Sequence, residues 1–183
     1  MRRSGFKGLV AAGVVAAGLV SSTSIVSASD MFLKLTNVKG ESVDDKHKGE
    51  IDVLSWSWGE STGTAKTRRG KVPAACIQDL TLTKFVDSAS PAFIMMGVTG
   101  EIANEAVLTV RRSGGDRQGE YFVLRMTNVI VAAYQTGGAG GDQNNLTESV
   151  VLSFDSLKGE YKPQKPDGTL GSPIFFDVSG ACR

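Results

Sequence analysis

Histidine and cysteine are both scarce in this sequence. Among 183 residues there is one histidine, His47, and there are two cysteines, Cys76 and Cys182. A zinc site needs several such ligands at short spacing, so we expect no metal site. A Ser/His/Asp or Cys/His catalyst would have to use His47. We interpret this residue as a solvated histidine in a polar turn, and we expect no catalytic residues and no cofactor.

A strong excess of charge is lacking as well. The formal net charge is +1, and residues 29–183 alone carry −2, because Arg2, Arg3 and Lys7 have no acidic partner in the first 28 residues. Proteins that bind nucleic acid usually show a basic excess that neutralises phosphates. We therefore expect no nucleic-acid partner.

The two cysteines do not form a recognisable disulfide framework, since they are few and their spacing is unpatterned. An exported location would allow them to pair. We favour two unpaired thiols, with Cys182 on a frayed C-terminal tail, and keep a disulfide as the alternative.

The first 28 residues have the order of a signal peptide. A basic start is followed by an apolar run, Leu9–Val20, and then by small polar residues that end in Val26-Ser27-Ala28. We expect cleavage after Ala28 and export of the protein. The apolar run is too short for a spanning helix of about 20 residues, so we expect no stable membrane anchor. If translation instead starts near Met31, the protein is assembled in the cytoplasm.

Residues 29–183 fit one domain with ordinary globular composition, 21% charged and 41% apolar. Apolar residues alternate along many runs, which indicates strands. We expect strands at 31–36, 51–58, 77–85, 105–112, 121–134, 149–154 and 157–162. One short helix is expected from Ser90, as N-cap, and Pro91 to Gly97 or Gly100. This pattern predicts a mainly β fold: an antiparallel β barrel of two sheets with one short α-helix.

Several strands carry apolar residues on both faces. Val151 alternates with Val150 and Leu152, and Val123 alternates with Phe122 and Leu124. One face can fill the barrel, and the short helix is too small to cover all of the other. We therefore expect neighbouring copies of the chain to cover it.

Two segments lack apolar anchors and are predicted to be long loops, 60–72 and 137–145. The first contains a basic cluster of Lys66, Arg68, Arg69 and Lys71. Aromatic residues for base stacking are absent from this cluster. We interpret it as a solvated or protein-contacting loop.

Five short motifs occur along the chain in this order: Leu54-Ser55-Trp56-Ser57-Trp58-Gly59, Thr83-Lys84-Phe85-Val86-Asp87, Ala89-Ser90-Pro91, Glu105-Ala106-Val107-Leu108-Thr109-Val110-Arg111 and Glu160-Tyr161-Lys162-Pro163-Gln164. With these motifs, the sequence resembles the hemolysin-coregulated protein (Hcp) family, the tube subunits of bacterial type VI secretion. The resemblance spans about Asp30 to Val178, in the family's order.

The resemblance implies a homohexameric ring that stacks into a tube inside a contractile sheath and carries effectors in its lumen. It also implies sheath, spike and effector proteins as partners, and the loop at 60–72 as the contact to the next ring. The family is structural, and we expect no toxin domain fused to this chain.

The sequence departs from the family in two places. Phe176-Asp177-Val178 stands where members commonly have Trp-Asp-Ile, and tube subunits normally lack a cleaved leader. The alternatives are therefore an exported Hcp-like ring that works outside the contractile apparatus and a monomeric β barrel that binds a ligand.

Overall fold

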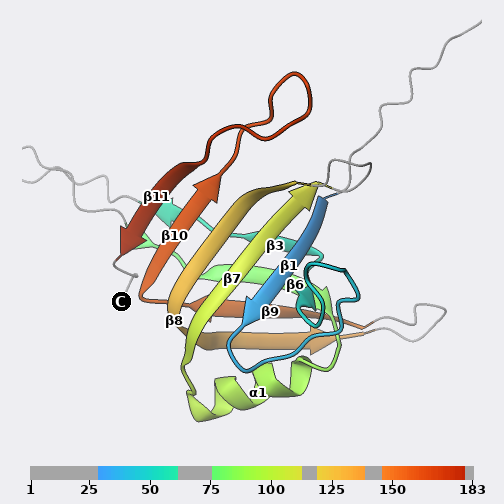
Figure 1. Ribbon diagram of the computed structural model, residues 1–183. Coiled ribbons are helices and arrows are strands. Elements are labelled where there is room, and N and C mark those ends of the chain that lie inside the picture. The colour runs from blue at the N-terminus through green and yellow to red at the C-terminus, as the bar shows by residue number, and fades with distance from the viewer. Residues whose placement is uncertain (1–28, 62–75, 113–118, 139–145, 180–183) are drawn as a thin grey trace, which may run out of the picture.

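The computed structural model describes residues 29–61, 76–112, 119–138 and 146–179. They form a mainly β fold with one helix (Figure 1). The elements are β1 (Ser29–Leu35), β2 (Ile51–Asp52), β3 (Ser55–Ser57), β4 (Glu60–Ser61), β5 (Cys76–Ile77), β6 (Leu80–Phe85), α1 (Ser90–Thr99), β7 (Ala103–Arg112), β8 (Glu120–Gly137), β9 (Thr147–Ser153), β10 (Ser156–Tyr161) and β11 (Ile174–Ser179).

Two antiparallel sheets share the long strand β8. The first sheet has the order β2-β1-β7-β8-β10-β11, and the second has the order β8-β9-β6-β3. Figure 1 shows the strands of the first sheet running diagonally, with β9 crossing beneath them. Within the described residues, no pairing joins β2, β3 and β11 to one another. The expected barrel is therefore present as two facing sheets and is not closed by hydrogen bonds among these strands.

The core lies between the two sheets. The predicted alternation in β1 is confirmed, because Leu33 and Leu35 are buried there and Met31 packs against them. The second sheet contributes Leu82, Val150 and other apolar side chains from the same face. Because side chains from both sheets occupy this space, the fold has a packed interior.

In strand β8, the buried side chains change from even-numbered to odd-numbered positions at Asn128. A simple alternation of buried and exposed residues therefore does not hold along the whole strand. Leu124 and Met126 are fully buried before this residue, and Val129 and Val131 are buried after it. Asn128 has a φ of 51°, a left-handed conformation that asparagine tolerates better than most residues. At this point β8 changes partner from β10 to β9.

Burial along β8 corrects the sequence-based argument for cover by other copies. That argument was that one of two alternating sets of apolar residues needs neighbouring copies to cover it. Val123, Val129 and Val131, which alternate with Phe122, Leu124 and Ile130, are all buried within one chain. Helix α1 packs against the second half of β8, where a Cβ on Gly97 would lie 3.6 Å from Val131. Among the apolar residues of that argument, Ile130 remains 37% exposed.

Helix α1 begins and ends close to where the sequence predicts. Ser90 is its first residue rather than its N-cap, and the cap position, Ala89, makes no side-chain cap bond. Asp87 accepts the Ala89 N–H instead, at 2.8 Å. Gly100 ends the helix with a φ of 71°, and its N–H donates to the Met96 carbonyl.

Strand β11 was not predicted, and it forms one edge of the first sheet. It pairs with β10 alone, placing Phe176 opposite Gly159. A Cβ on Gly159 would lie 2.0 Å from the Phe176 ring, so the glycine makes room for this aromatic side chain. Phe176 also stacks on Trp58, with ring centroids 6.3 Å apart. The expectation that an aromatic residue packs near the C-terminus is confirmed.

Candidate assembly surfaces

Two short paired strands flank the basic part of the predicted loop in the sequence. These strands are β4 and β5, with Glu60 opposite Ile77 and Ser61 opposite Cys76. Lys66, Arg68, Arg69 and Lys71 lie outside the described residues. Their role in contacts between rings therefore stays a prediction.

Cys76 corrects the expectation of two unpaired thiols, because it is disulfide-bonded. The other cysteine in the sequence, Cys182, lies outside the described residues. Spacing along the chain carries no information about proximity in space, which is why two isolated cysteines were misjudged.

His47 is buried rather than solvated. Its ring stacks on Phe32 with centroids 4.1 Å apart, and its Nδ1 lies 2.9 Å from Glu50 Oε2. The Glu120 carboxylate lies 3.5 Å from Nε2. The segment between β1 and β2 therefore folds back over the outer face of the first sheet and covers Phe32, which would otherwise face solvent.

Arg111, on β7, also binds the segment between β1 and β2. Its guanidinium donates to both carboxylate oxygens of Asp44 and, at 3.0 Å, to Asp30. The hydrogen bond from Arg111 is the main cause that lowers the pKa of Asp44 from 3.8 to about 2. The same bond raises the pKa of Arg111 further above its usual value. Bidentate pairing of this kind fixes geometry as well as charge.

A second buried cluster anchors α1 to the sheet. The Lys84 ammonium is fully buried and donates to Asp87 at 2.7 Å and to Glu148 at 2.8 Å. Tyr134 donates to the other oxygen of Glu148 at 2.7 Å, and burial raises the pKa of Tyr134 to about 12. Because Asp87 also accepts the Ala89 N–H, the cluster fixes the start of the helix.

Strand β11 presents apolar side chains and an unpaired edge to solvent. Ile174 is 60% exposed, Phe175 is 68% exposed, and the neighbouring Tyr161 of β10 is also exposed. An exposed, apolar edge strand is a ready template for contact with another chain.

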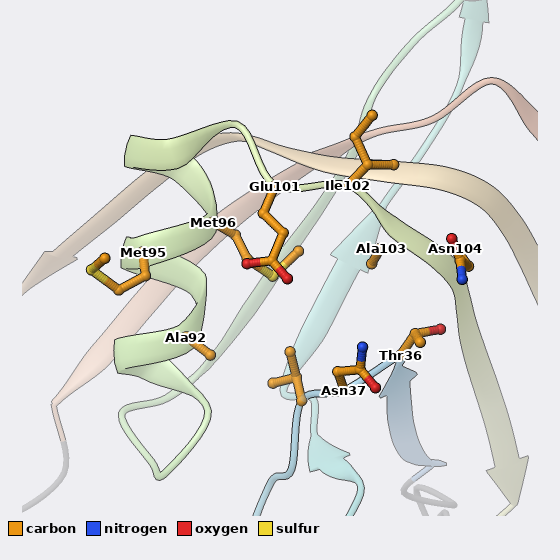
Figure 2. A pocket seen from close by; sticks show the side chains of 10 residues that line it. Thr36, Asn37, Ala92, Met95, Met96, Glu101, Ile102, Ala103 and Asn104 are labelled. Carbon is orange, nitrogen blue, oxygen red and sulfur yellow. The ribbon is translucent and has the colours of Figure 1, made fainter.

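The outer side of α1 is a second exposed apolar surface. Phe93 and Met96 face the core, and Ile94, Met95 and Val98 are exposed. A pocket of about 240 Å³ lies beside this helix. Figure 2 shows Ala92 and Met96 of the helix on one side of it and Asn37 on the other. The helix residues thus cover one side of the fold, as expected, and leave part of their own surface uncovered.

A basic groove adjoins this pocket, and the sequence reasoning missed it. The groove has a volume of about 780 Å³. It is lined by four exposed lysines: Lys34, Lys39, Lys46 and Lys48. These residues come from two segments that the fold brings together, so no run of basic residues in the sequence marks them.

The described residues contain no group of three or more His, Cys, Asp or Glu side chains arranged to hold a metal ion. In the same part of the chain, no helix combines the length and the apolar content needed to cross a membrane.

Comparison with known proteins identifies relatives of this chain. Residues 32–161 match the family model described as "Type VI secretion system effector, Hcp". Protein hcp1 of Pseudomonas aeruginosa is 42% identical over 152 residues, which are 81% of this chain and 93% of that protein.

Solved structures give the same family. A structure described as a type six secretion system protein superposes with a TM-score of 0.77 at 31% identity, covering 83% of this chain and 96% of that one. Hcp1 from Salmonella typhimurium superposes with a TM-score of 0.68 at 32% identity, covering 83% and 94%. These matches cover both sheets and α1, and the chain therefore belongs to the Hcp family of type VI secretion proteins.

Proposed function

We propose that this chain is a structural subunit of a type VI secretion tube. Its copies close into rings of six, the rings stack, and effector proteins travel in the lumen. This role requires no catalytic residues and no cofactor. Family membership supports the proposal, and one observation on the chain itself carries it: among the described residues, β11 pairs with β10 alone, and its apolar side chains are exposed.

The position of the exposed surfaces favours a ring over a simple dimer. The apolar part of β11 and the outer side of α1 lie on different parts of the molecule in Figure 1. Contact between two different patches on identical chains is head-to-tail, and such a contact closes into a ring when the rotation allows. A monomeric ligand-binding barrel is disfavoured, because apolar side chains from both sheets occupy the interior.

The partners follow from the same proposal. A stacked tube contacts a sheath on its outside, a spike at its end and effectors in its lumen. We assign the contact between rings to the loop at 60–72, because it belongs to the long connection between the paired strands β4 and β5 and contains the basic cluster. Delivery by this apparatus places the protein outside the cell.

Light scattering combined with negative-stain electron microscopy tests the ring. We expect the mass of six chains and closed rings from residues 29–183 at micromolar concentration. Replacement of Phe175 by Glu should reduce the rings to smaller species, because it places a charge on the apolar surface of β11. A uniformly monomeric wild-type sample would refute the ring.

A further inference from the structure

The basic groove is unusual because its four ammonium groups are not paired. Lys34, Lys39, Lys46 and Lys48 form no ion pair among the described residues. The single carboxylate in the lining, Glu50, lies against the buried His47. The net charge of residues 29–183 is negative, so this local excess is a distinct feature of one surface.

The groove is continuous with the pocket beside α1. Both are lined by the turn after β1, at Thr36, Asn37 and Val38. Asn37 holds a φ of 65°, and this left-handed residue turns the chain between the two compartments. Figure 2 shows Ala92 and Met96 on the side of the helix that faces Asn37, so the far compartment offers apolar contacts as well as the carboxylate of Glu101.

We propose that this composite groove is a docking site for an acidic segment of a partner protein. Carboxylates of the segment lie against the lysines, and an adjacent apolar side chain of the segment enters the pocket beside Ala92 and Met96. The charge of the lysines is complementary to such a segment, and no carboxylate of the described chain already neutralises it. The inference does not depend on the ring, since the groove is complete in one chain.

The lining favours a protein segment over nucleic acid. No aromatic side chain lines either compartment, so bases have no surface on which to stack. Glu50 and Glu101 would repel a continuous phosphate backbone, whereas a peptide can place backbone N–H groups beside them. The pocket beside α1 also has apolar side chains, Ala92 and Met96, which suit a Leu-like or Met-like side chain of a peptide.

Fluorescence anisotropy of a short labelled peptide of Glu-Glu-Leu repeats tests the proposal. We expect saturable binding to the full chain that weakens as salt is raised. The double variant K34E/K48E should weaken binding about tenfold or more, since each reversal replaces attraction with repulsion. Lys165→Glu is the matched control, because this exposed lysine lies in the connection between β10 and β11 and outside the groove. It should leave binding within about twofold.

Two further probes separate the two compartments. A peptide in which Ser replaces Leu should bind several-fold more weakly, and the ¹³C-methyl signal of Met96 should shift with the Leu peptide alone. A thermal melt of each variant checks that the fold is intact, and K34Q/K48Q supplies a second variant that adds no negative charge.

Four results would overturn the proposal. They are equal binding to K34E/K48E and wild type, equal binding of the Leu and Ser peptides, no binding of the peptide to a folded wild-type sample, and tighter binding of an oligothymidylate than of the peptide. The last result would make the groove a nucleic-acid site.

Discussion

Lys84 shows how a charged side chain can be tolerated in the core of this protein. Removing an ammonium group from water is costly unless nearby groups compensate it. Lys84 is fully buried, and it donates to Asp87, to Glu148 and to the carbonyl of Phe85. Each of these partners helps to compensate the buried charge, so the loss of one partner should lower the free energy of unfolding substantially.

Replacement of Lys84 by Met should destabilise the fold by about 3 to 5 kcal/mol, because it leaves the buried Glu148 without its cation. Urea denaturation measures this change. The double variant K84M/E148Q should recover a large part of the loss, since it removes the uncompensated charge. If the double variant is as unstable as the sum of its two single variants, the cluster does not act as a pair.

The Asp44–Arg111 contact predicts a loss of stability in acid. Asp44 has a folded-state pKa of about 2, below its ordinary value of 3.8. A lowered folded-state pKa means that the stabilisation is present above the ordinary value and is lost as pH falls towards the folded value. Urea midpoints should therefore fall between about pH 4 and pH 2, more steeply in wild type than in Asp44→Asn. Asp45→Asn is the matched control, and a profile for Asp44→Asn that equals wild type would contradict the role of the contact.

The sequence could place His47 in a turn but could not reveal its burial. A Lys-His-Lys sequence between acidic residues has the composition of a solvated loop. Its position depends on Phe32, an aromatic residue on the outer face of β1, and on the Glu50 carboxylate beside its ring. Contacts of this kind join residues whose proximity follows only from the folded path of the chain.

Among the elements, the β4–β5 hairpin carries the contact that we assign to ring stacking. Charge reversal at Arg68 and Arg69 should leave single rings intact and abolish stacks, because both residues belong to the long connection and not to the core. Electron microscopy counts rings and stacks in the same sample. Reversal of Lys165, an exposed residue in the connection between β10 and β11, is the control. Stacks that survive the reversal would remove the loop from this role, and loss of rings would place it at the subunit interface instead.

Alternation of apolar residues predicted β1, β7, β9 and β10 and was insufficient elsewhere. The predicted strands 51–58 and 77–85 are each broken into two, as β2 and β3 and as β5 and β6, and β4 lies in the predicted loop 60–72. In β8 the faces exchange because one residue, Asn128, adopts a left-handed conformation that no hydrophobic pattern encodes. In β11 the run Ile174-Phe175-Phe176 shows no alternation and follows a segment rich in Gly and Pro. It becomes a strand because β10 offers an edge and Gly159 leaves space for Phe176.

At the scale of the whole molecule, the arrangement of surfaces could not be read from the sequence. The argument for assembly rested on apolar residues in β8 that one chain already covers, such as Val123 and Val131. In the structure, the exposed apolar surfaces that could contact other copies lie instead on β11 and on the outer side of α1. The basic groove likewise forms only in the folded chain. The chain turns after β1 and folds back over the first sheet before β2, and this path brings Lys34 near Lys46 and Lys48.

The boundary of the folded domain gives the last prediction. We expect the mature protein to begin at Ser29, after cleavage behind Ala28. Ser29 is the first residue that the structure describes, and it lies in β1 opposite Arg112, so cleavage there leaves every described pair of β1 and β7 in place. A start at Met31 would remove Asp30, whose carboxylate lies 3.0 Å from Arg111.

Intact-mass analysis of the protein from its native host checks this boundary, and thermal melts of two shortened chains check its physical reason. The chain 29–183 should melt as the mature protein does. The chain 31–183 should melt lower, because Arg111 then keeps Asp44 as its one remaining carboxylate partner among the described residues. Asp30→Asn in the longer chain should reproduce part of that loss. A native mass that retains residues 1–28, or one that starts at Met31, would show that the leader is not cleaved as a signal peptide.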